Sequence, residues 1–328
     1  MTLQQPKRHV TTKNACVMDI LPPNDTGIQG AANLLRQGQL VAFPTETVYG
    51  LGADAKNDRA VAAIFQAKGR PQFNPLIIHV TSIAQARQFA VFNDVAERLA
   101  AAFWPGPLTL VLPLRDDSGL SPLVTAGLNT VAVRVPATDL AQKLLAEFAG
   151  PVAAPSANPS GKISPTRAQH VVDGLTGKIA AVLDGGACGV GVESTIVGVA
   201  PDPVWLRHGG LSTEAIEQCL GHALTTHETG GVLTAPGQMA SHYAPDAAMR
   251  LNATTREKGE LMLGFGQVVC HMNLSPSGDL LEAAANLFHH MRELDQMGAD
   301  RIAVSPIPEV GLGRAINDRL RRAAAPRP

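Results

Sequence analysis

Two cationic side chains and a run of hydroxyl groups lie close together in the first quarter of the chain. The segment PTETVYGLGADA covers residues 44–55, and KGRPQFNP follows at residues 68–75. The first segment is typical of a strand exit and the second of a helix end, so we expect Lys68 and Arg70 beside a turn at the edge of a sheet. Cations and hydrogen-bond donors in that position suit the binding of an anionic, phosphate-bearing ligand.

Lys68 interrupts an apolar pattern. Val61, Ile64 and Phe65 form a helical apolar stripe, and the next position of the series, seven residues after Val61, is Lys68. A charge therefore stands where the pattern predicts an apolar side chain. A lysine placed favourably at a helix C-terminus, or one whose ammonium group reaches out to solvent, is the alternative to a ligand contact.

An arginine interrupts a predicted strand in the same way. The segment TVAVRVP covers residues 130–136, and its alternation places Thr130, Ala132 and Arg134 on one face. An arginine inside such an apolar strand is costly unless it is paired with an anion. A structural salt bridge is the alternative to a ligand contact.

Two polar loops follow predicted strands. SANPSG, at residues 156–161, comes directly after the short strand PVAA, which is a preferred ligand position in α/β sheets; an ordinary Asn-Pro turn is the alternative. The glycine-rich segment 184–199 brings Glu193, Ser194 and Thr195 to the start of another strand. A plain hairpin loop is the alternative there.

The four cations of interest share one property, which is that each stands at the end of a predicted element. They are Lys68, Arg70, Arg134 and Arg207. Packing does not explain this repetition, so we predict that these elements converge on an anion site. The chain has no GxxxxGK[ST] loop, no GxGxxG after a strand and no HExxH. Any nucleotide must therefore be bound by side chains and small-residue loops.

Composition limits the class of protein. The formal net charge of -1 provides no general basic field for RNA or a membrane surface, and an aromatic content of 4% does not indicate a stacking platform for single strands. No apolar run reaches the roughly 18 residues of a membrane span. The four scattered cysteines, Cys16, Cys188, Cys219 and Cys270, predict neither a zinc site nor disulfides and favour the cytoplasm.

The length of 328 residues predicts two domains. Residues 1–24 form a polar N-terminal extension, and residues 25–221 alternate helices with strands in a pattern that predicts an α/β domain with a twisted, mixed sheet. Residues 222–246 are rich in Gly, Thr, Ser and Pro and are interpreted as a linker. Residues 247–328 predict a smaller α/β domain with a parallel sheet.

Two helices are predicted in the smaller domain, at residues 278–298 and 313–324. The second carries Arg319, Arg321 and Arg322, and the sequence leaves open whether they face a partner, tRNA or solvent.

Five motifs together resemble the Sua5/YrdC family of L-threonylcarbamoyladenylate synthases: PTETVYGLGADA, KGRPQFNPL, WPGPLTLVL, SANPSG and GVESTIV. APGQMASHYAPD and GLGRAINDRLRRAA are similar to the longer, two-domain Sua5 branch. The resemblance covers nearly the whole chain beyond residue 25. It implies a YrdC-like catalytic domain and a Rossmann-like C-terminal domain.

The resemblance also implies a reaction. The family is a group of nucleotidyltransferases that make threonylcarbamoyl-adenylate from L-threonine, bicarbonate or CO2, and ATP with Mg²⁺, releasing pyrophosphate. A partner transferase complex then moves the threonylcarbamoyl group to adenosine 37 of tRNA, so tRNA binding by this chain is expected to be weak or indirect. No membrane partner is implied.

The site residues implied by the resemblance fall into two sets. Threonine recognition is assigned to Thr47, His79, Arg134, Ser156 and Ser194. ATP binding is assigned to Lys68, Arg70, Asn74, Thr130, Asn158, Thr166, Arg207 and Tyr243. Lys68 and Arg70 take the catalytic role by offsetting phosphate charge, and residues 222–246 serve as a lid.

Two other functions remain open at this point. A carbamoyl-adenylate-forming carbamoyltransferase would use the same fold, but such proteins carry extra modules for which this chain has no CxxC pair and no spare length. An RNA-binding module is the other alternative, and the near-zero net charge argues against it as the main role.

Overall fold

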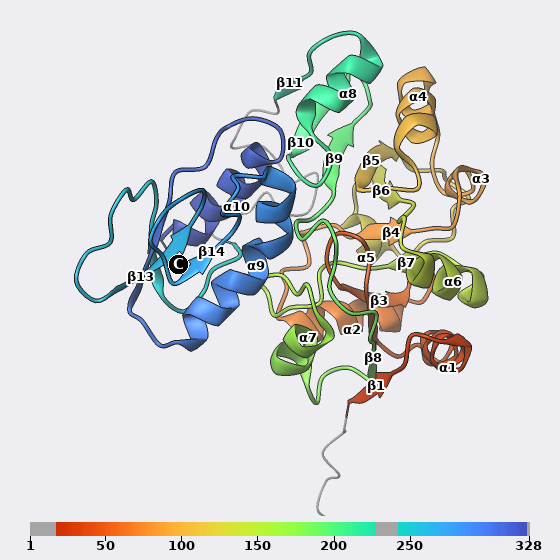
Figure 1. Cartoon of the computed structure of the whole chain (residues 1–328). Helices are drawn as coiled ribbons and strands as arrows, with labels where there is room; N and C mark the ends of the chain where they lie inside the picture. The colour runs from red at the N-terminus through yellow and green to blue at the C-terminus, as the bar shows by residue number, and fades with distance from the viewer. Residues whose placement is uncertain (1–17, 227–241, 327–328) are drawn as a thin grey trace, which may run out of the picture.

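The computed structural model describes residues 18–226 and 242–326, which form two lobes (Figure 1). The larger lobe is built on an 11-stranded sheet and the smaller on a 4-stranded sheet. Residues 227–241, most of the predicted linker, and residues 1–17, most of the predicted extension, lie outside the described residues. The domain boundaries themselves stay a prediction.

The large sheet mixes parallel and antiparallel pairs, as the sequence predicted. Its strands, in spatial order, are β1 (Asp19–Leu21), β8 (Ala181–Leu183), β2 (Val41–Phe43), β3 (Gly50–Asp54), β7 (Val152–Ala153), β4 (Ile77–His79), β6 (Thr130–Arg134), β5 (Leu108–Pro113), β9 (Thr195–Gly198), β10 (Val204–Arg207) and β11 (Thr225–Thr226). β4 and β6 are parallel, whereas β5 and β6 are antiparallel. His79 is paired with Arg134 in this register, and Arg134 with Thr109, so three polar side chains meet at one sheet edge.

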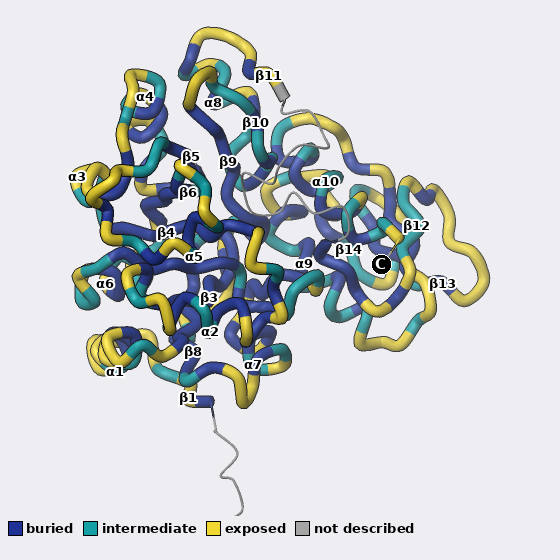
Figure 2. Tube along the Cα trace, turned by 180° about the vertical axis from the view of Figure 1, so that it is seen from behind, coloured by how far each residue is buried: buried dark blue, intermediate teal, exposed yellow. Residues whose placement is uncertain are grey.

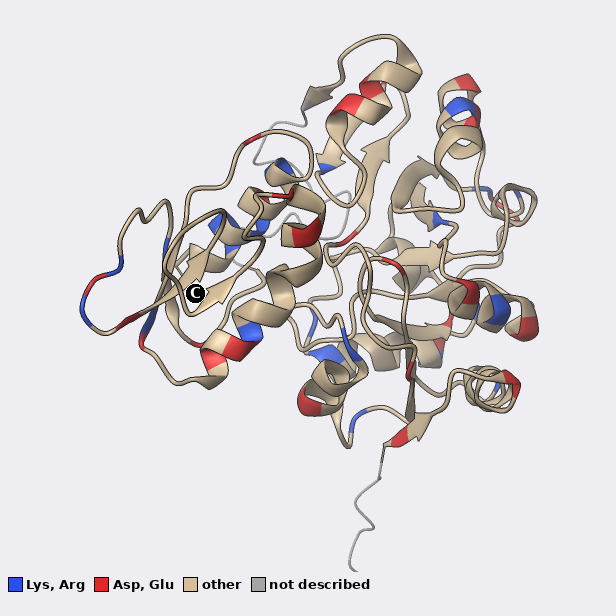
Figure 3. Ribbon diagram, viewed as in Figure 1, with Lys and Arg blue, Asp and Glu red and all other residues tan. Residues whose placement is uncertain are grey.

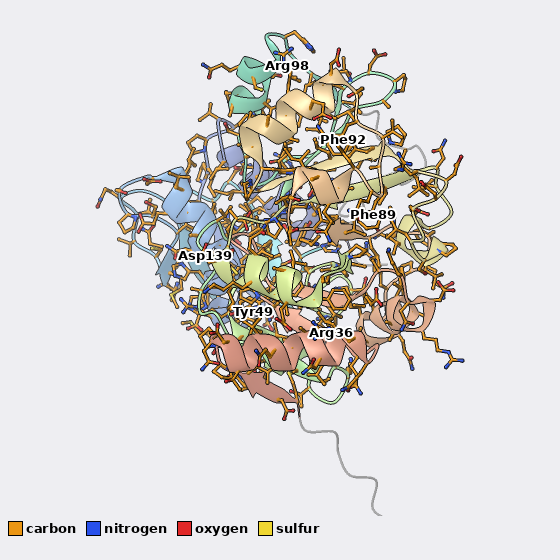
Figure 4. All side chains as sticks on the ribbon, turned by 90° about the vertical axis from the view of Figure 1, so that its right-hand side faces the viewer. Arg36, Tyr49, Phe89, Phe92, Arg98 and Asp139 are labelled. Atoms are coloured by element: carbon orange, nitrogen blue, oxygen red, sulfur yellow. The ribbon has the colours of Figure 1, made fainter. Side chains whose placement is uncertain are left out.

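Helices cover the large sheet. They are α1 (Asp25–Arg36), α2 (Asp58–Lys68), α3 (Ile83–Ala86), α4 (Asp94–Phe103), α5 (Pro122–Thr125), α6 (Asp139–Phe148), α7 (Ala168–Leu175) and α8 (Thr213–Leu220). Figure 4 shows α1 and α6 side by side on the flank away from the smaller lobe, where Arg36 pairs with Glu147 at 3.1 Å. Acidic and basic side chains are interspersed on these outer helices, in keeping with the net charge of -1 (Figure 3).

Local signals place α2. Asn57 caps its N-terminus by accepting from the Arg59 and Ala60 amides, and Gly69 ends it in the left-handed conformation at φ 62°. The apolar stripe of the helix is buried together with its last residue, Lys68. Gly69 thus ends the helix at the point where the Lys68 side chain enters the interior of the lobe.

The smaller lobe is a parallel sheet covered by helices, which confirms the α/β architecture predicted for it. Its strands, in spatial order, are β12 (Ala248–Arg250), β15 (Arg301–Val304), β13 (Glu260–Gly264) and β14 (Met272–Asn273). Its helices are α9 (Leu280–Gln296) and α10 (Gly313–Ala324). Asp279 caps α9 by accepting from the Leu281 and Glu282 amides.

The two lobes share an apolar core. Val48, Ile163 and Val192 of the larger lobe belong to the same buried cluster as Phe288 and Ile316 of the smaller one. Figure 2 shows buried chain continuing from the large sheet to α9 and α10. Such shared burial fixes the position of the smaller lobe against the loops that follow β2, β7 and β8. No helix in the described part of the chain is long and apolar enough to cross a bilayer.

Candidate active site

A chamber opens where β4 and β6 end, and segments far apart in the sequence, from Thr45 to Tyr243, line it. Its polar lining residues are Thr45, Thr47, Arg70, His79, Arg134, Ser156, Glu193, Ser194, Arg207, His242 and Tyr243. The structure therefore brings together most of the residues that the sequence predicted for one site. Thr45, Glu193 and His242 join them without having been assigned there.

Arg134 is held on three sides. Its guanidinium donates to Thr47 Oγ1 at 2.8 Å, to Glu46 Oε1 at 2.5 Å and to the Gly106 carbonyl at 3.2 Å. The side chain is 4% exposed, and within the described residues its ion pair is with Glu46. The salt bridge and the ligand contact, which the sequence left as alternatives, are compatible because the same guanidinium also lines the chamber.

Glu46 is a site residue that the sequence analysis did not identify. Its second oxygen accepts from the Ala137 amide at 3.1 Å and from the Thr138 hydroxyl at 3.4 Å. Burial raises the pKa of this carboxyl, but the charge and hydrogen bond of Arg134 outweigh burial and hold the pKa below its ordinary value. The signal available in the sequence was an acidic residue between two threonines in the segment TET, residues 45–47.

His79 presents a neutral ring to the chamber. Burial, followed by the charge of Arg134, lowers the pKa of this histidine to about 3. Its Nδ1 atom is buried and has no hydrogen-bond partner among the described residues. The imidazole is therefore available to a ligand as an uncharged hydrogen-bonding group.

Lys68 enters the site from the helix side. Its ammonium donates to the Ser156 carbonyl at 2.5 Å and to the Asn158 carbonyl, so it holds the SANPSG loop. Burial, followed by the nearby charge of Arg70, lowers the pKa of the lysine well below its ordinary value. Lys68 is thus neither at the surface nor merely a helix-ending charge.

Arg70 and Arg207 add two buried cations. Arg70 donates to the Asn74 carbonyl at 3.3 Å and to the Pro75 carbonyl at 3.0 Å. Arg207 donates to the Ser194 carbonyl at 2.9 Å, and Ser194 Oγ lies 2.7 Å from Thr109 Oγ1. These carbonyls orient both guanidinium groups toward the chamber without neutralising their charge.

Unpartnered polar atoms surround the same cations. Among the described residues, the buried side-chain atoms without a hydrogen-bond partner include Asn74 Oδ1, Asn158 Oδ1 and His242 Nδ1. Buried polar atoms are normally hydrogen-bonded. Their clustering beside Arg70 and Lys68 is what a site built for a polar ligand requires.

Five predicted residues are not among those that line the chamber: Lys68, Asn74, Asn158, Thr130 and Thr166. Thr130 shares the strand face with Arg134 but stands four residues earlier, about 13 Å along β6. Thr166 is buried, and its amide donates to His170 Nδ1 at 3.2 Å. A ligand contact by Thr130 requires a ligand that extends along the strand.

Tyr243 closes one side of the chamber. Its backbone is left-handed at φ 62°, and its ring stacks on Phe288 of α9 with centroids 5.5 Å apart. The guanidinium carbon of Arg319 lies over the Tyr243 ring, 5.2 Å from its centroid. A predicted linker residue is therefore fixed by the smaller lobe at the catalytic chamber.

Arg319 does not face a partner, tRNA or solvent, so the options left open by the sequence are wrong for this residue. Its side chain is 0% exposed. Arg321 does lie at the surface, where it pairs with Glu309 at 2.6 Å.

The described residues contain no group of three or more His, Cys, Asp or Glu side chains placed to hold a metal ion. The chamber's own carboxylate, Glu193, is already paired with Arg319 at 2.8 Å. The side chains described around the chamber therefore form no cage of protein ligands for Mg²⁺. Mg²⁺ that enters bound to phosphate oxygens and water fits it better.

The fold and the chamber together define an α/β protein with a buried, cation-lined site suited to an anionic ligand. The family model Sua5_yciO_yrdC, described as telomere recombination, matches residues 33–209, and a model described as the C-terminal domain of threonylcarbamoyl-AMP synthase matches residues 211–325. The chain belongs to the Sua5/YciO/YrdC family, in its two-domain form.

Relatives match over nearly the full length. A threonylcarbamoyl-AMP synthase of Bacillus subtilis is 43% identical, over 95% of this chain and 96% of the relative. One of Pyrococcus abyssi is 44% identical, over 90% and 94%. The crystal structure of P. abyssi Sua5 complexed with L-threonine matches with a TM-score of 0.86 and 41% identity, over 94% of this chain and 97% of that one. These findings confirm the predicted family, fold and class of enzyme.

More distant structures share the fold alone. Escherichia coli YciO has a TM-score of 0.53 at 22% identity, over 58% of this chain and 95% of its own. A HypF structure in a phosphate- and nucleotide-bound form has a TM-score of 0.51 at 18% identity and is covered over only 29% of its length.

Proposed function

We propose that this chain converts L-threonine, bicarbonate or CO2, and ATP into threonylcarbamoyl-AMP and pyrophosphate. One observation carries the proposal: Arg70, Arg134 and Arg207 converge with a neutral His79 in a single buried chamber. Three separate cations suit substrates that carry a carboxylate and a triphosphate. The P. abyssi relative, solved with L-threonine, supports the choice of amino acid.

The threonine half of the site is assigned to the end of β6 and the loops beside it. Arg134 binds the amino-acid carboxylate, and the uncharged His79 ring provides a hydrogen bond at the same edge. Thr47, Ser156 and Ser194 line the chamber around that point and supply hydroxyl groups for the threonine hydroxyl and amine. A site built around a hydrogen bond to a hydroxyl rejects analogues that lack it.

The ATP half is assigned to the helix side of the chamber. Arg70 and Arg207 bind the phosphates, and Lys68 acts with them through the SANPSG loop that it holds. Asn74 and Asn158 each offer a side-chain oxygen that has no hydrogen-bond partner in the described part of the chain. Outer contacts are assigned to Thr130, Thr166 and Tyr243, and Mg²⁺ enters as part of the MgATP substrate.

The reaction then proceeds in two bond-forming steps. The neutral threonine amine attacks CO2, and the proton lost from nitrogen combines with the hydroxide released when bicarbonate supplies that CO2. A carbamate oxygen next attacks the α-phosphorus of ATP, and pyrophosphate leaves with the electron pair of the broken phosphorus–oxygen bond. Arg70, Arg207 and Lys68 offset the negative charge that develops on the phosphates.

Exclusion of water protects the product, because a carboxylic–phosphoric anhydride hydrolyses readily. Burial of the threonine amine in the chamber also favours its neutral form. Tyr243 and His242 line the chamber from the end of the predicted linker. We therefore assign the lid role to residues 222–246, of which residues 227–241 lie outside the described part of the chain.

The product is a substrate for a further transfer. We propose that a partner transferase complex moves the threonylcarbamoyl group to adenosine in tRNA and that this chain contacts tRNA weakly or indirectly. We place the activity in the cytoplasm, where ATP and tRNA are found. The free thiols of Cys188, Cys219 and Cys270 support a reducing compartment.

Identification of the product tests the reaction directly. The purified full chain is incubated with L-threonine, ATP, Mg²⁺ and ¹³C-labelled bicarbonate, and the quenched mixture is examined by mass spectrometry. We expect threonylcarbamoyl-AMP that carries one ¹³C atom. Formation of threonyl-AMP without the label, or of carbamoyl-AMP from carbamoyl phosphate only, would contradict the proposal.

A further inference from the structure

One side chain of the smaller lobe reaches the wall of the chamber. Arg319 of α10 is fully buried, and its Nε atom lies 2.8 Å from Glu193 Oε2. Its Nη1 atom donates to the His208 carbonyl at 2.7 Å and to Asp318 at 2.8 Å. Arg319 is therefore held from both lobes, and its ion pair with Glu193 crosses the interface between them.

Glu193 places a negative charge in a chamber that must bind anions. It lines the same cavity as Arg70, Arg134 and Arg207, and its other oxygen accepts from the Ser164 hydroxyl at 2.5 Å. Burial raises the pKa of this carboxyl, but the charges of Arg319 and then Arg207 outweigh burial and hold the pKa below its ordinary value. Glu193 is therefore an anion at neutral pH.

A buried carboxylate without a partner of its own would turn to the nearest cations. Burial lowers the pKa values of Arg207 and Lys68, and the nearby charge of Glu193 raises both. A pair between Glu193 and either cation would occupy a group needed for phosphate and would add repulsion against the triphosphate. Arg319 instead binds Glu193 from the side of the smaller lobe.

We propose that Arg319 is a positioning residue for ATP: by pairing with Glu193 it keeps that carboxylate from the cations of the chamber and leaves them for the phosphates. The identity of the anion as ATP rests on the proposed function. The smaller lobe thus contributes to substrate affinity through a residue that touches no substrate. Anion binding in the chamber of the larger lobe thus depends on Arg319 of the smaller lobe.

A purely structural role for Arg319 predicts a different pattern of effects among substituted chains. Arg292 of α9 also crosses the interface, where it donates to the Ile163 carbonyl, but it does not line the chamber. Loss of interface stability alone should therefore be reproduced by Arg292→Gln. A charge effect should be specific to Arg319 and should disappear when Glu193 is also neutral.

The test compares four full-length variants: Arg319→Gln, Glu193→Gln, the double variant, and Arg292→Gln as the control. Equilibrium binding of ATP and of inorganic pyrophosphate is measured by calorimetry, with L-threonine binding as the reference. We expect Arg319→Gln to weaken ATP and pyrophosphate binding about tenfold or more and threonine binding much less. The double variant should recover most of that loss, and Arg292→Gln should show none of it.

Glu193→Gln keeps the test decisive if Arg319→Gln fails to fold. Removal of the carboxylate should leave pyrophosphate affinity equal to or higher than that of the unaltered chain. The inference would be overturned if Glu193→Gln lost tenfold in pyrophosphate affinity or if the double variant bound pyrophosphate no better than Arg319→Gln. Equal losses of threonine and pyrophosphate affinity in Arg319→Gln would also overturn it. Binding of pyrophosphate needs no turnover, so failure of the proposed reaction would be seen separately as an inactive but anion-binding protein.

Discussion

Arg134 Nη2 lies 2.5 Å from Glu46 Oε1, so the arginine at the end of β6 is oriented by a carboxylate from the loop after β2. The pair is largely buried, with side chains 4% and 15% exposed. An arginine held in this way needs little reorganisation when an amino-acid carboxylate arrives. If Arg134 binds the threonine carboxylate as proposed, Glu46 supports threonine binding through its control of Arg134.

Glu46→Gln should raise the KM for threonine several-fold and leave the KM for ATP nearly unchanged. Glutamine keeps one acceptor for Arg134 but loses the charge that fixes its geometry.

Arg134→Lys should have the larger effect, about tenfold or more in the KM for threonine, because a lysine cannot replace bidentate binding. Steady-state kinetics with each substrate varied in turn checks both changes, and Arg36→Lys, in the exposed pair with Glu147, is the control. An equal rise in both KM values would argue against a threonine-specific role.

Lys68→Met should lower kcat by about 100-fold or more. The proposed phosphate site would lose a buried positive charge, and the SANPSG loop would lose its hydrogen bonds from Lys68 to the Ser156 and Asn158 carbonyls. Pyrophosphate release under saturating substrates measures the loss. Lys143→Met is the matched control, since Lys143 lies exposed on α6. Activity within twofold of the unaltered chain would contradict the assigned role.

The lowered pKa of Lys68 predicts that ATP affinity depends on pH. Burial and the charge of Arg70 lower its pKa in the free protein, whereas a bound triphosphate favours the charged ammonium and raises the pKa again. A group whose pKa rises on binding takes up a proton, so ATP affinity should increase as the pH falls. Calorimetry in two buffers of different ionisation enthalpy should detect proton uptake that Lys68→Met reduces. No uptake by the unaltered chain would mean that Lys68 is already charged before ATP binds.

Tyr243→Ala should uncouple ATP use from product formation. The ring stacks on Phe288, and Arg319 lies over it, so its removal opens the chamber beside the labile anhydride. The ratio of ATP consumed to threonylcarbamoyl-AMP formed should rise clearly above one. Tyr243→Phe keeps the packing and should stay coupled. A ratio that Tyr243→Ala leaves unchanged would remove the support for a lid at this position.

Gly191→Ala should loosen the contact between the lobes. Gly191 has φ 77°, and a Cβ atom there would lie 2.3 Å from the Ala284 carbonyl oxygen and 2.4 Å from Ala285 Cα of α9. The left-handed backbone and this contact should together cost about 2 kcal/mol or more of the free energy of unfolding. Gly189→Ala is the control, since a Cβ at that position meets no atom of the described residues within 4 Å. Equal thermal stability of the two variants would contradict this description of the interface.

Much of the fold could be predicted because its signals are local. The helix at residues 313–324 is observed as Gly313–Ala324, and the helix predicted at 278–298 is observed as Leu280–Gln296. Hydrophobic periodicity and caps are short-range properties and remain valid in the folded chain. Short elements such as α5 (Pro122–Thr125) were missed, since four residues carry too little periodicity.

The site was less predictable because its polar pairs are formed across the sequence. Arg134 stood out as a charge inside an apolar strand and Arg207 as a charge at the end of one. Their partners, however, come from the loop after β2 and the start of β9. Arg319 resembled a surface arginine on a basic helix, and only docking of the smaller lobe buries it against Glu193. Partners that meet only through tertiary packing leave no spacing signal along the chain.

The most direct measurement is pyrophosphate release from ATP by the purified chain, with L-threonine and bicarbonate present together or singly, and with serine or valine in place of threonine. The chamber as described predicts release that requires both threonine and bicarbonate. Serine should be used less efficiently by about tenfold to a few hundredfold, and valine by up to a factor on the order of 10⁴. Release that is the same without threonine or without bicarbonate would contradict the account.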